Sequence, residues 1–162
     1  DVEYESVYQT AWKPLSADYF SQRKTGLEKL KKEHSLIDKT GLSESEQISL
    51  DLLAFLFDDE LFNIEYESYL MPLNSEGGFL IEIVYVLRGI RLNSEKKKNQ
   101  YLEKVSALPA YLDAQTAMLR RGMETGKMQP KLIVEAALNV LDDHAKNMRG
   151  EQSIFLLPVS DK

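Results

Sequence analysis

Apolar residues recur along most of the chain with the period of an α-helix. A first helix is expected from Ala17 to about Glu33, with Ser16 as its N-cap. A second helix is expected to begin after Ser43, because the sequence Ser-Glu-Ser-Glu at positions 43–46 is a capping box. In such a box the side chains of Ser43 and Glu46 each accept a hydrogen bond from the other residue's backbone amide.

The second helix is unusually apolar for a helix on a protein surface. Its apolar positions are Ile48, Leu52, Leu53, Phe55, Leu56, Leu61, Phe62 and Ile64. Since a helix that is apolar on most of its faces is normally buried, we expect it to be the central helix of the fold. Its acidic run at 57–60, Phe-Asp-Asp-Glu, is expected to form a polar stripe or to pair with basic residues elsewhere in the chain.

The helical pattern is interrupted between Met71 and Phe79. Pro72 restricts Met71 to extended backbone, and the pair Gly77–Gly78 permits backbone angles that other residues avoid. This segment is therefore predicted to be a loop. The run Leu80–Ile90 fits a strand by its β-branched residues and a short helix by its length; we favour the helix, because no partner strand is evident.

Further helical segments occupy the rest of the chain. One is capped by Asn93 or Ser94 and meets Pro109, where we expect a kink or a restart because proline lacks the amide donor. Gly126 is predicted to end the resumed helix in the left-handed conformation, and Pro130 to open the next.

The predicted fold class is all-α, an irregular bundle of four or five helices with short loops and one Pro-kinked helix. Residues 1–15 are expected to be an N-terminal arm, residues 16–150 a helical domain, and residues 151–162 an apolar tail. Ile154–Pro158 in this tail is a candidate docking surface.

Composition excludes several classes of function. The 20 Lys and Arg against 26 Asp and Glu give a net charge of −6, which argues against a nucleic-acid partner. The absence of cysteine excludes disulfides and thiolate metal sites. No run approaches the roughly 18 apolar residues of a transmembrane helix, and the acidic start has no apolar core of the signal-peptide kind.

Candidate catalytic and metal-binding motifs are not found. The two histidines, His34 and His144, belong neither to a His-Glu-x-x-His motif nor to a Glu-x-x-His motif. The run Asp142–His144 is expected to be a solvated helix end, because neighbouring helical positions diverge by about 100° and cannot converge on one ion. We therefore assign no catalytic residue, no metal ligand and no cofactor to this chain.

Two longer segments carry a resemblance to a known family. They are Tyr69–Phe79, YLMPLNSEGGF, and Tyr101–Leu138, which contains LPAYLDAQTAMLRRGMETG. This pattern resembles the bacterial family called domain of unknown function 885. The matching positions are Pro72, Leu73, Gly77, Gly78, Tyr101, Leu102, Leu108, Pro109, Tyr111, Leu112, Asp113, Arg121, Gly122, Gly126 and Pro130.

The resemblance implies a predominantly helical protein similar to zinc metallopeptidases, with a His-Glu-x-x-His motif far downstream of the region that matches. It also implies export, often as a lipoprotein, so a periplasmic or lipid-anchored location is expected, although the residues themselves also suit the cytoplasm. The motif is missing here, so no zinc ligand is carried over. We expect this chain to be the N-terminal part of a longer protein whose zinc lies elsewhere.

Three hypotheses of function follow. In the first, the chain is the non-catalytic N-terminal region of a metallopeptidase and forms scaffold or substrate channel, with Tyr66, Tyr69, Gly77 and Gly78 near the channel wall. Tyr66 and Tyr69 fall at helical spacing, so they would line a groove or lie half-buried with their hydroxyls at the rim. The expected partners are the rest of the polypeptide, a peptide substrate, and a second copy of the chain bound through exposed apolar surface.

The second hypothesis is a stand-alone helical protein-binding or scaffold module. The third is a small hydrolase that uses the carboxylates of Asp58, Asp59, Asp142 or Asp143.

Overall fold

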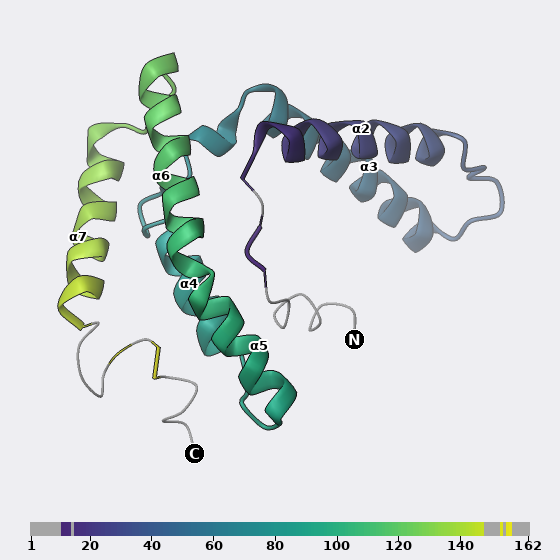
Figure 1. Cartoon of the computed structure of the whole chain (residues 1–162). Helices are drawn as coiled ribbons and strands as arrows, with labels where there is room; N and C mark the ends of the chain where they lie inside the picture. Colours follow the sequence, from purple (N-terminus) through teal and green to yellow (C-terminus); the bar gives the residue numbers. More distant parts are fainter. Residues whose placement is uncertain (1–10, 14, 148–152, 154, 157–162) are drawn as a thin grey trace. The chain divides into compact units, whose positions relative to one another are not determined.

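The computed structural model describes residues 11–13, 15–147, 153 and 155–156. These residues contain helices and no strand, so the predicted all-α class is confirmed (Figure 1). The elements are α2 (Ala17–Ser35), α3 (Glu44–Glu65), the 3-10 helix η1 (Ser68–Leu70), α4 (Phe79–Arg88), α5 (Glu95–Ser106), α6 (Leu108–Thr125) and α7 (Lys131–Asn147). The chain divides into two compact units: the hairpin unit, Pro14–Tyr69, and the main unit, Asp1–Lys13 with Leu70–Lys162.

The hairpin unit consists of α2 and α3 packed side by side in opposite directions (Figure 1). The half-buried apolar residues of α3 form an inner seam spaced alternately by four and three positions: Leu50, Ala54, Phe57, Leu61 and Ile64. His34 of α2 meets this seam, with its Nε2 2.9 Å from the carbonyl oxygen of Leu50 and its ring edge-on to Phe57. The inner seam is therefore the face of α3 that packs on α2.

Ion pairs flank this contact between the two helices. Asp58 pairs with Lys31, and Glu60 accepts a hydrogen bond from Nε of Arg23 at 2.6 Å. The prediction that the acidic run at 57–60 pairs with basic residues is thus confirmed for two of its three acids. Exposed pairs of this kind contribute about 0–1 kcal/mol each, so they set the alignment of α2 on α3 more than its stability.

The expectation that α3 is the buried central helix is wrong. No residue of α3 is buried, although the helix is apolar around most of its circumference. Within the hairpin unit α2 covers one side of α3, and the side opposite the inner seam remains exposed.

The predicted N-caps are confirmed. Ser16 and Ser94 accept hydrogen bonds from the amides three positions later, and Ser43 and Glu46 form the reciprocal capping box. The hydrogen bonds that Glu46 accepts from Ser43 lower the pKa of the Glu46 carboxyl. These caps satisfy amide groups that the first turn of a helix leaves without partners.

The later helix boundaries follow the proline and glycine signals. The run favoured as a helix is α4, with the strand alternative excluded. At Pro109 the chain restarts, since α5 ends at Ser106 and α6 begins at Leu108. Gly126 ends α6 in the left-handed conformation with φ 73°, and the carbonyl of Pro130 accepts the first hydrogen bonds of α7.

The core of the main unit is built mainly from α4, α5 and α6. Phe79, Ile83 and Leu87 recur every four residues, which places them on one face of α4, and all three are buried. Other buried apolar side chains of this unit are Leu70, Ile90, Tyr101, Leu108, Tyr111 and Ala137.

Trp12 ties the segment before α2 to α5 and α6 within the main unit. Its indole ring stacks on Tyr111 with 4.9 Å between ring centroids, and its Nε1 donates to the carbonyl of Lys104 at 2.9 Å. Lys104 is 4% exposed, and its Nζ lies 4.6 Å from the Trp12 ring centroid and donates to the carbonyl of Ala11 at 3.2 Å. Burial lowers the pKa of Lys104, because it disfavours the charged ammonium group. The Trp12 ring and the Ala11 carbonyl offset part of the free-energy cost of burying that charge.

Tyr111 and Gln115 form a buried polar pair on α6. Gln115 is buried, and its Nε2 donates to the hydroxyl of Tyr111 at 2.8 Å. Its Oε1 has no hydrogen-bond partner among the described residues. Burial also raises the pKa of Tyr111, so its hydroxyl is protonated at neutral pH and available to the amide.

We predict that Tyr111→Phe costs about 1–3 kcal/mol in free energy of unfolding, because it leaves the buried amide of Gln115 entirely unpaired. The same substitution in a Gln115→Met background should cost less than half as much, since no amide is then stranded. Urea unfolding followed by Trp12 fluorescence measures both values. Equal costs in the two backgrounds would show that the pair is not coupled.

Candidate functional site

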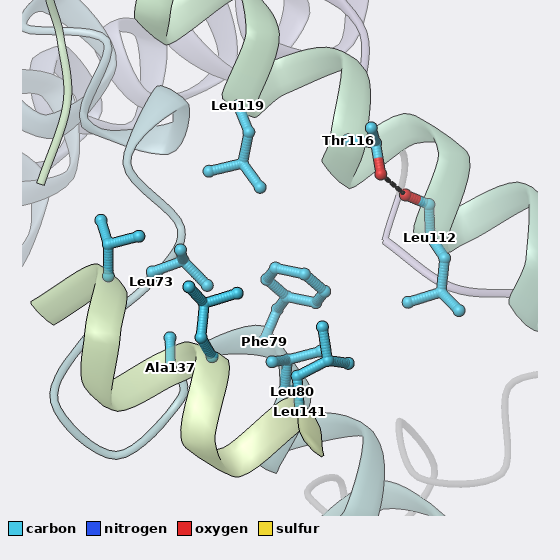
Figure 2. Close-up of a pocket in the computed structure, with 10 residues that line it drawn as sticks. Leu73, Phe79, Leu80, Leu112, Thr116, Leu119, Ala137 and Leu141 are labelled. Carbon is cyan, nitrogen blue, oxygen red and sulfur yellow. Dashed lines mark hydrogen bonds between the residues drawn. The ribbon is translucent and has the colours of Figure 1, made fainter. Parts of the chain in front are cut away.

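A concavity lies within the main unit, between α6, α7 and the loop that joins η1 to α4. It consists of two adjoining cavities of about 250 and 380 Å³. We treat the two cavities as one site, the α6–α7 groove, because four residues line both of them: Leu73, Leu119, Val134 and Leu138. Figure 2 shows side chains from all three segments converging on the first cavity, with the ring of Phe79, from the start of α4, among them.

The second cavity is rich in methionine. Met71, Met123 and Met128 line it together with Leu70, Lys127 and Gln129. Methionine is unbranched and polarizable, so it can adapt to apolar groups of different shapes. This end of the groove is therefore suited to apolar ligands that vary in side chain.

The polar side chains of Thr116 and Gln129 in the groove are already engaged with backbone. The Thr116 hydroxyl donates to the carbonyl of Leu112 at 2.9 Å (Figure 2). Gln129 donates from Nε2 to the carbonyls of Leu73 at 2.9 Å and Met71 at 3.3 Å. The groove consequently offers its occupant mainly apolar contact surface.

Asn74 organises the loop that forms one wall of the groove. Its Oδ1 accepts hydrogen bonds from the amides of Glu76 at 2.9 Å and Gly78 at 2.7 Å, and its carbonyl accepts from Gly77 at 3.0 Å. The amide of Phe79 then donates to the carbonyl of Pro72 at 3.3 Å. The loop is thus folded back on itself before it enters α4, and Leu73 and Phe79 at its two ends both line the first cavity.

Gly77 and Gly78 allow this loop and α7 to approach closely. Gly78 has φ 61°, and a Cβ there would lie 2.1 Å from the carbonyl oxygen of Pro72. Gly77 has φ 108°, and a Cβ there would lie 3.0 Å from Cγ1 of Val140 on α7. Both predicted site residues therefore permit close contacts of this loop, while a direct contact between either glycine and a substrate stays a prediction.

Tyr66 and Tyr69 lie in the hairpin unit. They do not share a helix, because α3 ends before Tyr66 and Glu67 has φ 54°. Tyr66 is exposed and stacks on Phe62 with 4.2 Å between centroids. The ring of Tyr69 stacks on Phe20 with 3.7 Å between centroids, and its hydroxyl donates to Glu67 at 3.2 Å. The two rings thus sit in separate stacks, and their role in a substrate groove stays a prediction.

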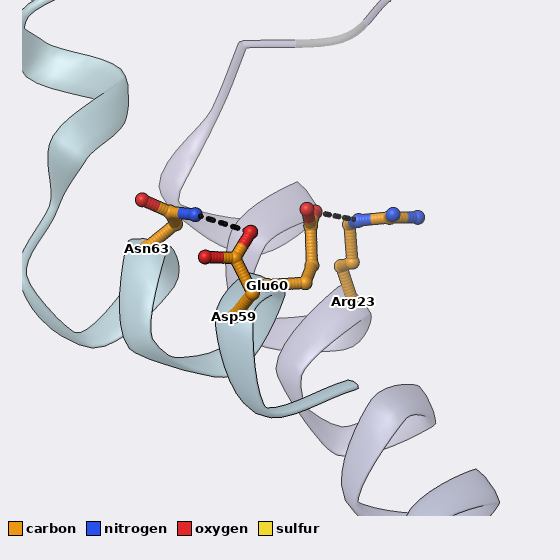
Figure 3. A network of polar contacts seen from close by, with 4 residues as sticks. All are labelled: Arg23, Asp59, Glu60 and Asn63. Carbon is orange, nitrogen blue, oxygen red and sulfur yellow. Dashed lines mark hydrogen bonds and ion pairs between the residues drawn. The ribbon is translucent and has the colours of Figure 1, made fainter. Parts of the chain in front are cut away.

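The carboxylates named as alternative catalytic groups are exposed. Asp58 and Glu60 are paired with cations, while Asp59 accepts from Nδ2 of Asn63 at 3.2 Å (Figure 3). On α7, Asp143 lies 3.7 Å from Nζ of Lys146. Within the described part of the chain, no group of three or more His, Cys, Asp or Glu side chains is placed to hold a metal ion.

The apolar tail Ile154–Pro158 lies largely outside the described residues. Of its members, Phe155 and Leu156 are described, and the carbonyl of Phe155 accepts a hydrogen bond from the Tyr101 hydroxyl at 2.5 Å. Burial raises the pKa of Tyr101, so this hydroxyl is a donor at neutral pH. Whether the tail docks a partner stays a prediction.

A comparison with protein-family models finds one family that matches this chain. The model of a bacterial protein family of unknown function, DUF885, matches residues 3–162, which is nearly the full length of this chain. The chain belongs to the DUF885 family. No curated protein and no solved structure matches it. Among the described residues of this DUF885 chain, no helix is long and apolar enough to cross a membrane.

Sequence reasoning missed the α6–α7 groove. It recognised the glycine loop but not the role of Asn74. An Asn in a stretch rich in turn-forming residues is a signal that its side chain accepts a hydrogen bond from the amide two residues later, here that of Glu76. Three leucines of α7 are exposed: Leu132, Leu138 and Leu141. An apolar stripe too wide for one neighbouring helix is the signal that a groove would leave.

We predict that Gly78→Ala lowers the free energy of unfolding of the main unit by at least about 2 kcal/mol, because the new methyl group meets Pro72 and φ stays positive. Gly26→Ala in α2 is the matched control. No atom lies within 4 Å of its Cβ position, so the same substitution should stabilise the hairpin unit by about 0.5–1 kcal/mol. Circular dichroism during urea unfolding measures both, and a Gly78 variant as stable as wild type would contradict the loop geometry.

Proposed function

We propose that this chain is a non-catalytic helical region of a zinc metallopeptidase-like protein, and that the α6–α7 groove forms part of its substrate channel. The observation that carries the proposal is the pair of adjoining apolar cavities, in which Thr116 and Gln129 already donate to backbone. Such a groove holds apolar side chains by burial and leaves bond cleavage to another part of the protein.

The chemistry of the groove favours peptide side chains over peptide backbone. A backbone amide placed among Leu, Val and Met side chains would lose its hydrogen bonds to water, at a cost of about 1–3 kcal/mol by protein mutational data. Apolar side chains gain about 25 cal/mol for each Å² removed from water. A bound peptide would therefore insert Leu-, Phe- or Met-like side chains into the groove and keep its backbone at the open side.

The metal and the compartment belong to the same proposal. The described residues offer no metal-binding group, so no catalytic step is assigned to them. Zinc would be held by a His-Glu-x-x-His helix elsewhere in the parent polypeptide, and the parent would be exported, as a periplasmic protein or a lipoprotein. Both statements rest on the family resemblance.

The alternative is a stand-alone helical protein-binding module. The exposed apolar side of α3 favours it, because a long unpartnered stripe is typical of a docking surface. Binding of short apolar peptides in the α6–α7 groove supports the channel, whereas binding confined to α3 supports the module.

A matched pair of leucines on α7 tests the groove. Leu138 lines both cavities and is 53% exposed, whereas Leu132 is 75% exposed and lines neither. Leu138→Asp should raise the dissociation constant of a short leucine- and phenylalanine-rich peptide by about tenfold, which is about 1.4 kcal/mol. Leu132→Asp should change it less than about twofold, since an exposed substitution away from the site has little effect.

Fluorescence of Trp12 is a convenient readout, since Trp12 stacks on Tyr111 and Tyr111 contacts Phe79, which lines the groove. A peptide in which serine replaces each apolar residue serves as the control ligand. Equal loss of binding in the two aspartate variants, or equal binding of both peptides, would refute the groove as the site.

The channel-wall role of the tyrosines has its own test in the complete protein. Tyr66→Ala is expected to raise KM for peptide hydrolysis with kcat retained, because the ring would contact substrate and not the reacting bond. Tyr66 is the better position, since Tyr69 supports the Phe20 stack and its loss would disturb the hairpin unit. Unchanged kinetics would remove Tyr66 from the channel.

A further inference from the structure

The exposed side of α3, continued by its C-cap residue Tyr66, carries a regular pattern that packing on α2 does not explain. Its members, which we call the outer stripe, are spaced alternately by four and three positions: Ile48, Leu52, Phe55, Asp59, Phe62 and Tyr66. This is the spacing of the seam through which one helix packs along another in a coiled coil. The apolar members are between 54% and 64% exposed.

The outer stripe lies opposite the inner seam. At about 100° per residue, the two sets point to opposite sides of α3, so α2 cannot cover both. A helix apolar on both sides is normally packed on both sides, and an exposed apolar stripe of this length is typical of a surface that binds another protein. The stripe thus has the length and spacing to receive one further helix.

The charges of α3 define what kind of helix fits. The helix contains seven acidic residues and no Lys, Arg or His: Glu44, Glu46, Asp51, Asp58, Asp59, Glu60 and Glu65. Lys39, Lys31 and Arg23 pair with three of these acids, and Glu46 serves the capping box. Asp59, in the middle of the outer stripe, accepts a hydrogen bond from the neutral amide of Asn63 (Figure 3).

A second copy of the chain is a poor occupant for this stripe. Antiparallel pairing of two outer stripes would place Asp59 against Phe55 of the other copy, and parallel pairing would place two Asp59 carboxylates together. Since α3 has no basic residue, neither arrangement neutralises a carboxylate that is being removed from water. An unpaired charge in such a seam costs several kcal/mol.

We propose that the outer stripe of α3 binds an amphipathic helix of a different protein, one with an apolar seam and a Lys or Arg facing Asp59. Apolar contacts supply the attraction, and the Asp59 pair sets register and excludes helices that lack the basic residue. This inference does not depend on the α6–α7 groove, which lies in the other unit.

Two synthetic helical peptides of the same length as α3 test the proposal. Both have leucine at the seam positions, and they differ at one central seam position, which is Lys in the first and Glu in the second. The chain should bind the Lys peptide at least about tenfold more tightly than the Glu peptide. Asp59→Asn should reduce that ratio to less than about threefold, with the circular dichroism spectrum unchanged because Asp59 is exposed.

Two further variants keep the test specific to the stripe. Phe55→Ser should weaken both peptides, since Phe55 is an apolar member of the stripe and is 64% exposed. Tyr85→Ser is the matched control, because Tyr85, which is 69% exposed, is a similarly exposed aromatic residue on α4, outside the hairpin unit. It should leave both affinities unchanged.

Three outcomes would overturn the proposal. The first is equal binding of the two peptides, and the second is a Lys preference that persists in Asp59→Asn. The third is concentration-dependent dimerisation in analytical ultracentrifugation that Phe55→Ser abolishes, which would assign the stripe to a second copy.

Discussion

The α6–α7 groove depends on the hydrogen bonds that Gln129 donates to the carbonyls of Met71 and Leu73. Gln129 lies in the turn between α6 and α7, so these bonds join that turn to the loop before α4. The loop in turn is closed by Asn74 and by the approach of Gly78 to Pro72. Polar contacts at one end of the groove therefore hold the α6–α7 turn against the loop that lines it.

The two apolar surfaces of the chain differ in chemistry. The groove is concave, rich in methionine and leucine, and suited to isolated apolar side chains. The outer stripe of α3 lies along a helix, has heptad spacing and carries Asp59 at its centre, so it suits a continuous helix with a matching cation. Each unit thus presents an apolar surface that its own helices leave uncovered.

Local signals in the sequence predicted most of the helix boundaries. The capping box at Ser43, the break at Pro109 and the left-handed Gly126 each act within a few residues, so no distant contact can override them easily. Burial was predicted less well, as α3 shows. An apolar pattern indicates that a helix face is normally covered, but it does not indicate which part of the protein or which partner covers it. The groove was missed for the same reason, since Gln129 and Met71 are 58 positions apart and no local pattern links them.

Photo-crosslinking of a leucine-rich peptide, followed by mass spectrometry of the linked residues, tests the central claim most directly. The account predicts that a photoreactive leucine in the peptide labels Leu119, Leu138 and Met71, which lie on three different segments and meet in the groove. The labelling should be lost on competition with unmodified peptide. Labelling of Leu132 at a similar yield, or labelling scattered over the main unit, would contradict the assignment of the groove as a peptide site.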